Sequence, residues 1–226
     1  MTVKAVFFGT IGTLAETSEI QRRAFNIAFA EHDLEWIWDR ESYLRMLRHP
    51  GKEARVRRYA EAAGEDVDAR AVDASQERAF DAIVTREGVE ARPGVRELMD
   101  EARARDVAVV FVTGTGQRQI DTILQGLDLR VEDFDWVGSP EEDAPAKPSP
   151  DLHLAALRDL GLDASEVVAI EDTPDSAAAA LAAGLPTVGF PGAAARDRSF
   201  PKGVPLVERL EPRTLLEGGV ASQAAE

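Results

Sequence analysis

Short apolar runs alternate with longer amphipathic segments along most of this chain. The apolar runs have the length of buried strands and lie at residues 3–8, 107–112, 134–137, 167–170 and 187–190. Between them, apolar residues recur at helical spacing, as in Val95, Leu98, Met99 and Ala102. Strands that alternate with helices at short intervals are typical of a doubly wound α/β fold with a mostly parallel sheet.

The stretch between the first two predicted strands has a helical pattern only. Ser18 and Gln21 have the spacing of a capping box at the start of the first helix, and helices are predicted over 52–63 and 69–86. We therefore expect a core domain of residues 1–15 and 91–218, an inserted α-helical cap of residues 16–90, and a frayed tail at 219–226. Trp36 and Trp38 are expected to pack between the helices of the cap.

Composition excludes several classes of function. The formal net charge is −15, which disfavours binding to nucleic acid or to an anionic membrane surface. The absence of cysteine excludes disulfides and thiolate chemistry. No apolar run reaches the ~18 residues of a membrane span, and the first residues lead directly into a strand without the pattern of a signal peptide. We expect a cytoplasmic protein.

Candidate chemistry gathers where the predicted strands end, because parallel sheets bind ligands at the carboxyl ends of their strands. The segments there are Gly9–Leu14, Thr113–Gly116, Lys147 and Glu171–Asp175. Each alone has a simpler interpretation: the glycines as turns, Lys147 as a surface lysine, and the acidic pair as a helix cap. Neither glycine-rich loop completes a Walker A motif or a GxGxxG motif.

Taken together, in this order and spacing, the four segments resemble the haloacid dehalogenase superfamily of phosphohydrolases. The predicted helical insert is similar to the small cap of β-phosphoglucomutase and phosphoglycolate phosphatase. Within that group, the chain most resembles the xylulose-bisphosphate phosphatase (CbbY-type) branch. That likeness is carried by the segment from Gly12 to Tyr43, by Pro50-Gly51-Lys52-Glu53, by KPSPD at 147–151 and by AIEDT at 169–173.

The resemblance implies roles for particular residues. Phosphate binding is assigned to Thr10, Thr113, Gly114 and Lys147, and binding of Mg²⁺ to Asp172 with Glu171 beside it. Glu16, Gln21, Lys52 and Arg55 are the candidates for contacts between the cap and a substrate. Gln21 stands where the branch has histidine, and one extra residue within 51–55 weakens the case for Lys52 and Arg55.

The first motif departs from the family at two decisive positions. The family sequence is Asp-x-Asp-Gly-Thr-Leu, whereas residues 9–14 read Gly-Thr-Ile-Gly-Thr-Leu. Gly9 replaces the nucleophilic aspartate, a loss that typically costs about 10⁴ to 10⁶ in turnover, and Ile11 replaces a general acid worth about 10² to 10⁴. Because Mg²⁺ binds through one or two carboxylates in addition to the substrate phosphate, we expect weak binding of Mg²⁺ or none.

Three hypotheses follow. The first is a non-catalytic pseudophosphatase, inactive as a phosphatase, that binds a small phosphorylated metabolite or a protein partner. The alternative is an active hydrolase that acts on such a metabolite by an altered mechanism. The third is a purely structural role. A turnover assay separates the second hypothesis from the others, and stabilisation by a ligand separates the first from the third.

Overall fold

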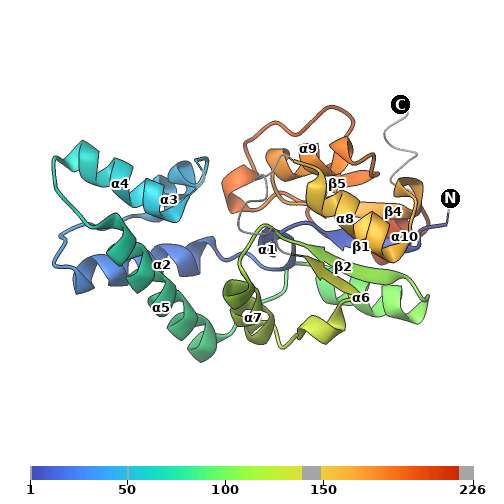
Figure 1. Cartoon of the computed structure of the whole chain (residues 1–226), viewed down its shortest axis with the longest axis horizontal. Helices are drawn as coiled ribbons and strands as arrows, with labels where there is room; N and C mark the ends of the chain where they lie inside the picture. Colours follow the sequence, from blue (N-terminus) through green and yellow to red (C-terminus); the bar gives the residue numbers. More distant parts are fainter. Residues whose placement is uncertain (1, 50, 139–148, 219–226) are drawn as a thin grey trace. The chain divides into compact units, whose positions relative to one another are not determined.

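A parallel sheet forms the centre of the larger part of the molecule (Figure 1). Within the described residues it has five strands, in the spatial order β3-β2-β1-β4-β5. They are β1 (Ala5–Phe8), β2 (Ala108–Val112), β3 (Trp136–Gly138), β4 (Val167–Glu171) and β5 (Thr187–Gly189). Each neighbouring pair is parallel, so the predicted doubly wound α/β fold is confirmed. Prediction and structure differ at the strand ends by up to two residues.

This computed structural model describes residues 2–49, 51–138 and 149–218, so the frayed tail expected at 219–226 lies outside the described residues. The chain divides into two compact units. The first, called here the core unit, comprises residues 1–16 and the chain from residue 90 onward, and the second, the helical unit, comprises residues 17–89. These boundaries lie one residue away from those expected from the sequence.

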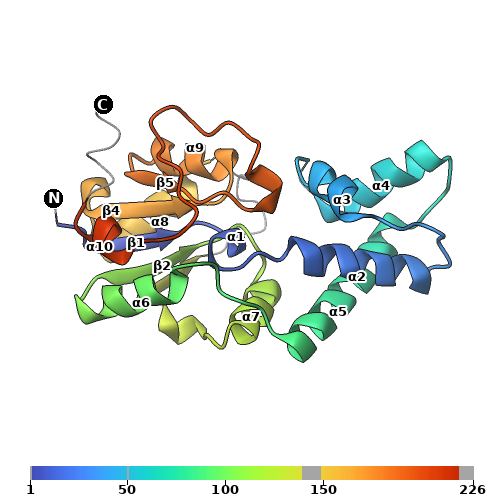
Figure 2. The same cartoon turned by 180° about the vertical axis from the view of Figure 1, so that it is seen from behind.

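Both faces of the sheet are covered by helices (Figures 1 and 2). On one face, Ala5 and Phe7 of β1 and Val110 of β2 pack in a buried cluster with α8 (Asp151–Leu160) and α9 (Pro174–Ala182). On the other side lie α6 (Val95–Ala104), which contacts β2, and α10 (Pro212–Leu216), which contacts α6. The core unit also contains α1 (Ile11–Leu14), α7 (Gln117–Gly126) and the 3₁₀ turns η1 (Val131–Asp133), η2 (Ala164–Glu166) and η3 (Ala193–Ala195).

The described residues of the helical unit form helices only, as predicted. They are α2 (Ser18–Glu31), α3 (Arg40–Met46), α4 (Lys52–Ala63) and α5 (Ala69–Glu87), and α2 packs along α5. The helix α4 ends where expected, because Gly64 adopts the left-handed conformation (φ 73°) that terminates a helix.

The capping box predicted at Ser18 is wrong. Thr17 is the N-cap of α2, and the Gln21 Nε2 donates to the Thr17 hydroxyl at 3.1 Å.

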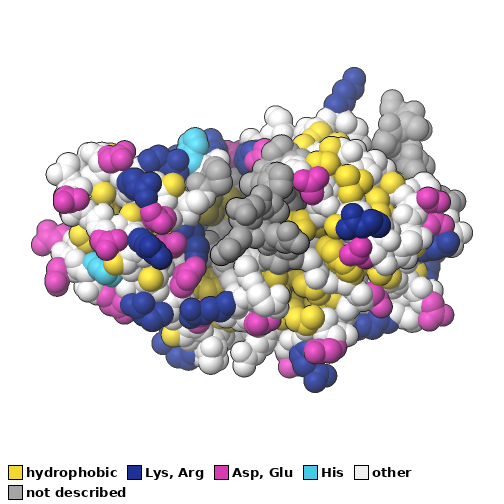
Figure 3. Space-filling model, in the orientation of Figure 1, with side chains coloured by type: hydrophobic (Ala, Val, Ile, Leu, Met, Phe, Trp, Pro, Cys, Tyr) yellow, Lys and Arg dark blue, Asp and Glu magenta, His cyan; other side chains and the backbone are white. Residues whose placement is uncertain are grey.

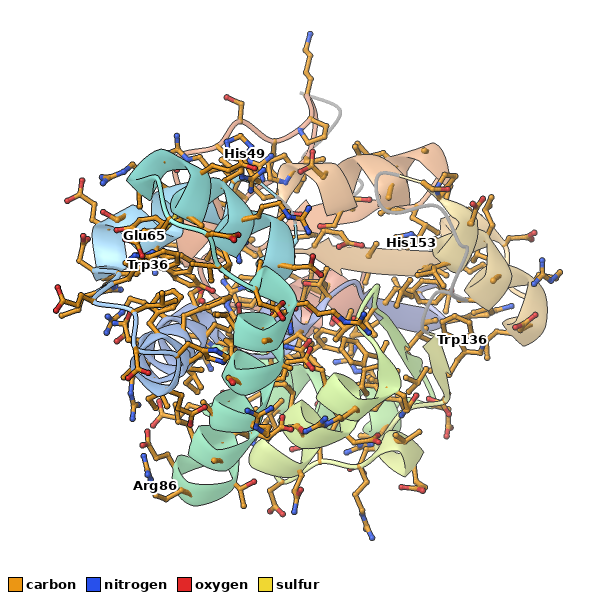
Figure 4. The ribbon with its side chains drawn as sticks, turned by 60° about the vertical axis from the view of Figure 1, so that its left-hand side comes forward. Trp36, His49, Glu65, Arg86, Trp136 and His153 are labelled. Carbon is orange, nitrogen blue, oxygen red and sulfur yellow. The ribbon has the colours of Figure 1, made fainter. Side chains whose placement is uncertain are left out.

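Aromatic side chains fill the centre of the helical unit. The Trp38 ring, 1 % exposed, lies 4.8 Å from the ring of Phe25 and 4.7 Å from that of Phe29. Trp36 is also buried, and its indole Nε1 donates to the Glu65 carboxylate at 3.1 Å (Figure 4). The two tryptophans therefore pack in the interior, as the sequence predicted.

The surface of each unit mixes charges of both signs. On the face in Figure 3, acidic and basic side chains alternate over the helical unit, whereas hydrophobic side chains gather over part of the core unit. The most exposed large hydrophobic residues of the core unit are Leu206 (54 %) and Leu154 (43 %). None of the helices within the described residues has the length and apolar character needed to cross a bilayer.

We expect Trp38→Ala to lower the free energy of unfolding by about 3–5 kcal/mol, because it leaves a large cavity among packed rings. Urea denaturation followed by circular dichroism measures this change. The matched control is Ile37→Ala, at a neighbouring side chain that is 79 % exposed, with an expected effect within about 0.5 kcal/mol. Equal effects of the two substitutions would contradict the packing role of Trp38.

Candidate functional site

Parallel pairing brings three of the predicted segments to one edge of the sheet. Phe8 of β1 is in register with Phe111 of β2 and with Ile170 of β4. The residues just beyond that level are Gly9 and Thr113, which follow their strands, and Glu171, which ends β4. Lys147, predicted to bind phosphate, lies outside the described residues.

The carboxylate of Glu171 fills the space in which a side chain of residue 9 would lie. A Cβ atom built on Gly9 would lie 1.9 Å from Oε2, 2.1 Å from Oε1 and 2.1 Å from Cδ of Glu171. These are distances that real non-bonded atoms do not reach. A carboxylate from β4 therefore occupies the space in which the Cβ of a larger residue at position 9 would lie.

Glu171 is held by a histidine. Its side chain has no solvent exposure, and its Oε1 lies 2.8 Å from Nε2 of His153, which is fully buried as well. With Glu171 in its ionised form, the carboxylate only accepts, and the imidazole then donates through Nε2. His153 comes from α8 (Figure 4) and was missed in the sequence. The available signal was a histidine on the same helical face as Ala156 and Leu157, two buried apolar residues.

The first-motif loop is held by short hydrogen bonds of its own. Thr10, the N-cap of α1, donates its hydroxyl to Oδ1 of Asp172 at 2.7 Å, and Thr13 donates its hydroxyl to the carbonyl of Thr10 at 2.6 Å. The close approach of Asp172 to this loop needs glycine at position 12, since a Cβ on Gly12 would lie 1.8 Å from Oδ2 of Asp172. Ile11 points into the interior with 8 % exposure. Thr10 and Asp172, predicted to bind phosphate and metal respectively, thus contact each other.

The loop after β2 contains the hydroxyl of Thr113 and the solvent-exposed backbone of Gly114. Thr113 is fully buried, and its hydroxyl oxygen accepts the backbone N–H of Thr115 at 3.1 Å, which leaves the hydroxyl proton available for a further acceptor. Gly114 is exposed, and a Cβ on it would meet no atom of the described residues within 4 Å. A small anion can approach this backbone without displacing a side chain.

Arg92 was missed as a structural residue of the site, because the Arg-Pro-Gly run at 92–94 reads simply as the end of the helical insert. Its guanidinium donates to the carbonyl oxygens of Gly12 (2.7 Å), Phe190 (2.8 Å) and Pro191 (2.8 Å). It also lies over the ring of Phe190, 3.4 Å from the centroid. Burial lowers the pKa of Arg92, although the charge of Asp172 opposes this shift. The arginine thus joins the first-motif loop to the segment after β5.

The four residues predicted to contact substrate from the cap divide between the two units. Glu16 belongs to the core unit, where its Oε2 accepts the N–H of Ala193 at 2.6 Å. Gln21, in the helical unit, accepts the hydroxyl of Tyr43 at 3.1 Å.

Lys52 and Arg55 of the helical unit are engaged by that unit itself. The ammonium of Lys52 lies 2.6 Å from the Glu77 carboxylate. The Arg55 side chain is 5 % exposed and donates to the backbone carbonyl of His49 at 3.2 Å, and burial lowers its pKa. Both predicted roles in substrate binding stay predictions.

The fold family implies a Mg²⁺ ion at this edge of the sheet, so the residues there must offer oxygen ligands to it. Gly9 offers no side chain, Glu171 is buried against His153, and one oxygen of Asp172 accepts the Thr10 hydroxyl. No group of three or more His, Asp or Glu residues that could hold a metal exists in the part of the chain that the structure describes. The present arrangement therefore does not fit a Mg²⁺ site, which needs an open octahedral set of oxygen ligands.

Comparisons with known proteins agree with this fold. The model of the haloacid dehalogenase-like hydrolase family matches residues 3–184, and this chain belongs to that family. It is 34 % identical to Protein CbbY of Rhodobacter capsulatus over 88 % of this chain and 90 % of that protein. It is 36 % identical to the plasmid-encoded Protein CbbY of Cupriavidus necator over 88 % of this chain and 82 % of that one.

A solved structure extends the comparison. CbbY from Rhodobacter sphaeroides in complex with phosphate superposes with a TM-score of 0.80 at 30 % identity, covering 92 % of this chain and 94 % of that chain. A mutant of the same protein has been solved in complex with xylulose-(1,5)bisphosphate, with the same similarity to this chain. The predicted resemblance to the haloacid dehalogenase superfamily and to CbbY-type proteins is confirmed.

We expect Arg92→Met to lower the free energy of unfolding by about 2–4 kcal/mol, because three backbone carbonyls lose their charged donor. Chemical denaturation measures the loss. Arg92→Lys should restore less than half of it, since one ammonium cannot reproduce the planar fork of the guanidinium. The control is Arg158→Met, at an exposed surface arginine, with an expected change within about 0.5 kcal/mol. A loss as small as that of the control would contradict the joining role of Arg92.

Proposed function

We propose that this chain is a non-catalytic phosphate-binding member of its family, a pseudophosphatase that recognises a small phosphorylated metabolite. The observation that carries the proposal is the replacement of the first-motif carboxylate by a buried one. At the end of β1, Gly9 has no nucleophile to offer, and the carboxylate beside it, from Glu171, is inaccessible to solvent. In-line attack on phosphorus needs an exposed oxygen nucleophile.

Proton transfer is lost at the same edge. Ile11, at the position of the family's general acid, is an apolar side chain with 8 % exposure. Thr10 and Thr13 do not supply a substitute, because their hydroxyl protons are directed to the Asp172 carboxylate and to the Thr10 carbonyl. Among the described residues, the two first-motif positions therefore offer neither a nucleophile nor an acid for the leaving group.

The groups that bind phosphate in the family have counterparts in this chain. The Thr113 hydroxyl keeps a proton to donate, the Gly114 backbone is exposed, and the sequence places Lys147 in the motif that the family uses for phosphate. The relatives favour a sugar phosphate as the ligand, since a CbbY structure holds xylulose-(1,5)bisphosphate. The helical unit takes the part of the cap in this proposal.

An active hydrolase of altered mechanism is the second candidate. The observation that favours it is that a carboxylate, that of Glu171, still lies beside residue 9. Its complete burial and its bond to His153 count against attack on a substrate. A turnover assay decides between the two.

We expect no hydrolysis of sugar phosphates above background, with or without Mg²⁺, because Gly9 and Ile11 supply neither a nucleophile nor a general acid at the first motif. Release of inorganic phosphate from a panel that includes xylulose-1,5-bisphosphate measures this. A Mg²⁺-dependent turnover of about 1 s⁻¹, within the ordinary enzyme range, would establish the altered mechanism instead.

Phosphate binding should appear as thermal stabilisation without Mg²⁺. A ligand at about a hundred times its dissociation constant stabilises the folded state by about 2.7 kcal/mol, which raises the melting temperature by about 5–10 °C for a chain of this size. Differential scanning fluorimetry with inorganic phosphate and with a sugar bisphosphate measures the shift.

Lys147→Ala should abolish this shift, because it removes the cation that the family motif supplies. Lys202→Ala is the matched control: it removes the same charge from an exposed position of the core unit and should leave the shift intact. Two results argue against phosphate binding at the site: no shift at tens of millimolar phosphate, or equal shifts in the two variants.

A further inference from the structure

Gly9 and Glu171 are complementary in volume. The Cβ of any residue larger than glycine at position 9 would overlap both carboxylate oxygens of Glu171, at 1.9 and 2.1 Å. Such an overlap is relieved at little cost when the obstructing group is the free end of a flexible side chain. Glu171 is not in that situation, because it has no exposure and its Oε1 is bonded to the equally buried His153 at 2.8 Å.

From this geometry we infer that Glu171 replaces the side chain of residue 9 as a structural group and that His153 is the positioning residue that fixes it there. The residues lie just after β1, in α8 and in β4, and they form one buried unit: glycine provides the space, glutamate fills it, and histidine forms a hydrogen bond with the glutamate.

The consequence is a constraint on the first motif. A carboxylate cannot be reinstalled at position 9 by changing that residue alone, because its place is occupied by a side chain that would have to break a buried hydrogen bond to leave.

A thermal-stability cycle tests the volume relation. Gly9→Ala should lower the melting temperature by about 5 °C or more, as expected for overpacking a buried site. In a Glu171→Ala background the same change should cost less than about 2 °C, because the obstructing carboxylate is gone. If Gly9→Ala does not fold, recovery of folding in the double variant serves as the same test.

Gly116→Ala is the matched control for the alanine itself. A Cβ on Gly116 meets no atom within 4 Å, and the residue has an extended backbone (φ −66°, ψ 151°) that alanine tolerates. Its expected effect is under about 2 °C in either background. An equal cost of Gly9→Ala in the wild-type and Glu171→Ala backgrounds, or a cost no larger than that of Gly116→Ala, overturns the inference.

The positioning role of His153 has a separate readout. His153→Phe removes this hydrogen bond, so if His153 fixes Glu171 the cost of Gly9→Ala should fall to less than half. His153→Gln keeps an N–H donor and should preserve most of that cost. If Gly9→Ala costs as much in His153→Phe as in the wild type, His153 does not position Glu171. These measurements involve neither phosphate nor turnover, so their failure is distinguishable from failure of the proposed function.

Discussion

The backbone of β1 is hydrogen-bonded on both sides, to β2 and to β4, in parallel register. All four of its residues are buried, so the strand cannot shift without exposing the centre of the core. This pairing forces Gly9, Thr113 and Glu171 to one edge of the sheet, although the chain separates them widely. The contact between Thr10 and Asp172 depends on this alignment, because these residues follow β1 and β4 respectively.

Most polar groups at this edge bond to other parts of the protein. Glu171 contacts His153, Thr10 contacts Asp172, and Arg92 holds three carbonyls of two loops. In an enzyme that uses a metal, carboxylates at such an edge must face the ion with oxygens available. Here the carboxylates of Glu171 and Asp172 instead form hydrogen bonds within the core unit. The Thr113 hydroxyl accepts the Thr115 N–H but keeps its proton to donate, and with the exposed Gly114 backbone it is the group through which we propose that phosphate binds.

The helical unit shows the same preference for internal contacts. Its basic candidates are engaged within the unit: Lys52 with Glu77, and Arg55 with backbone carbonyl groups while its guanidinium lies 5.6 Å from the centroid of the Tyr43 ring. A sequence motif identifies such residues by position in the chain. Whether a charged group faces a ligand or its own fold depends on the partners that packing brings near it.

Hydrophobic periodicity and glycine stops in the sequence determined the order and type of the elements, because helices and strands depend on residues a few positions apart. The helix Lys52–Ala63 before Gly64 has the residue bounds that the sequence predicted. The capping pattern at Ser18 was a less reliable signal, because the N-cap of that helix is Thr17. The sequence also showed that Gly9 cannot be a nucleophile. Only the tertiary structure decided that Glu171 fills the space beside Gly9 and that a histidine of α8 holds it. These residues lie far apart in the chain, and their contact arises from strand order and side-chain direction, which no local pattern encodes.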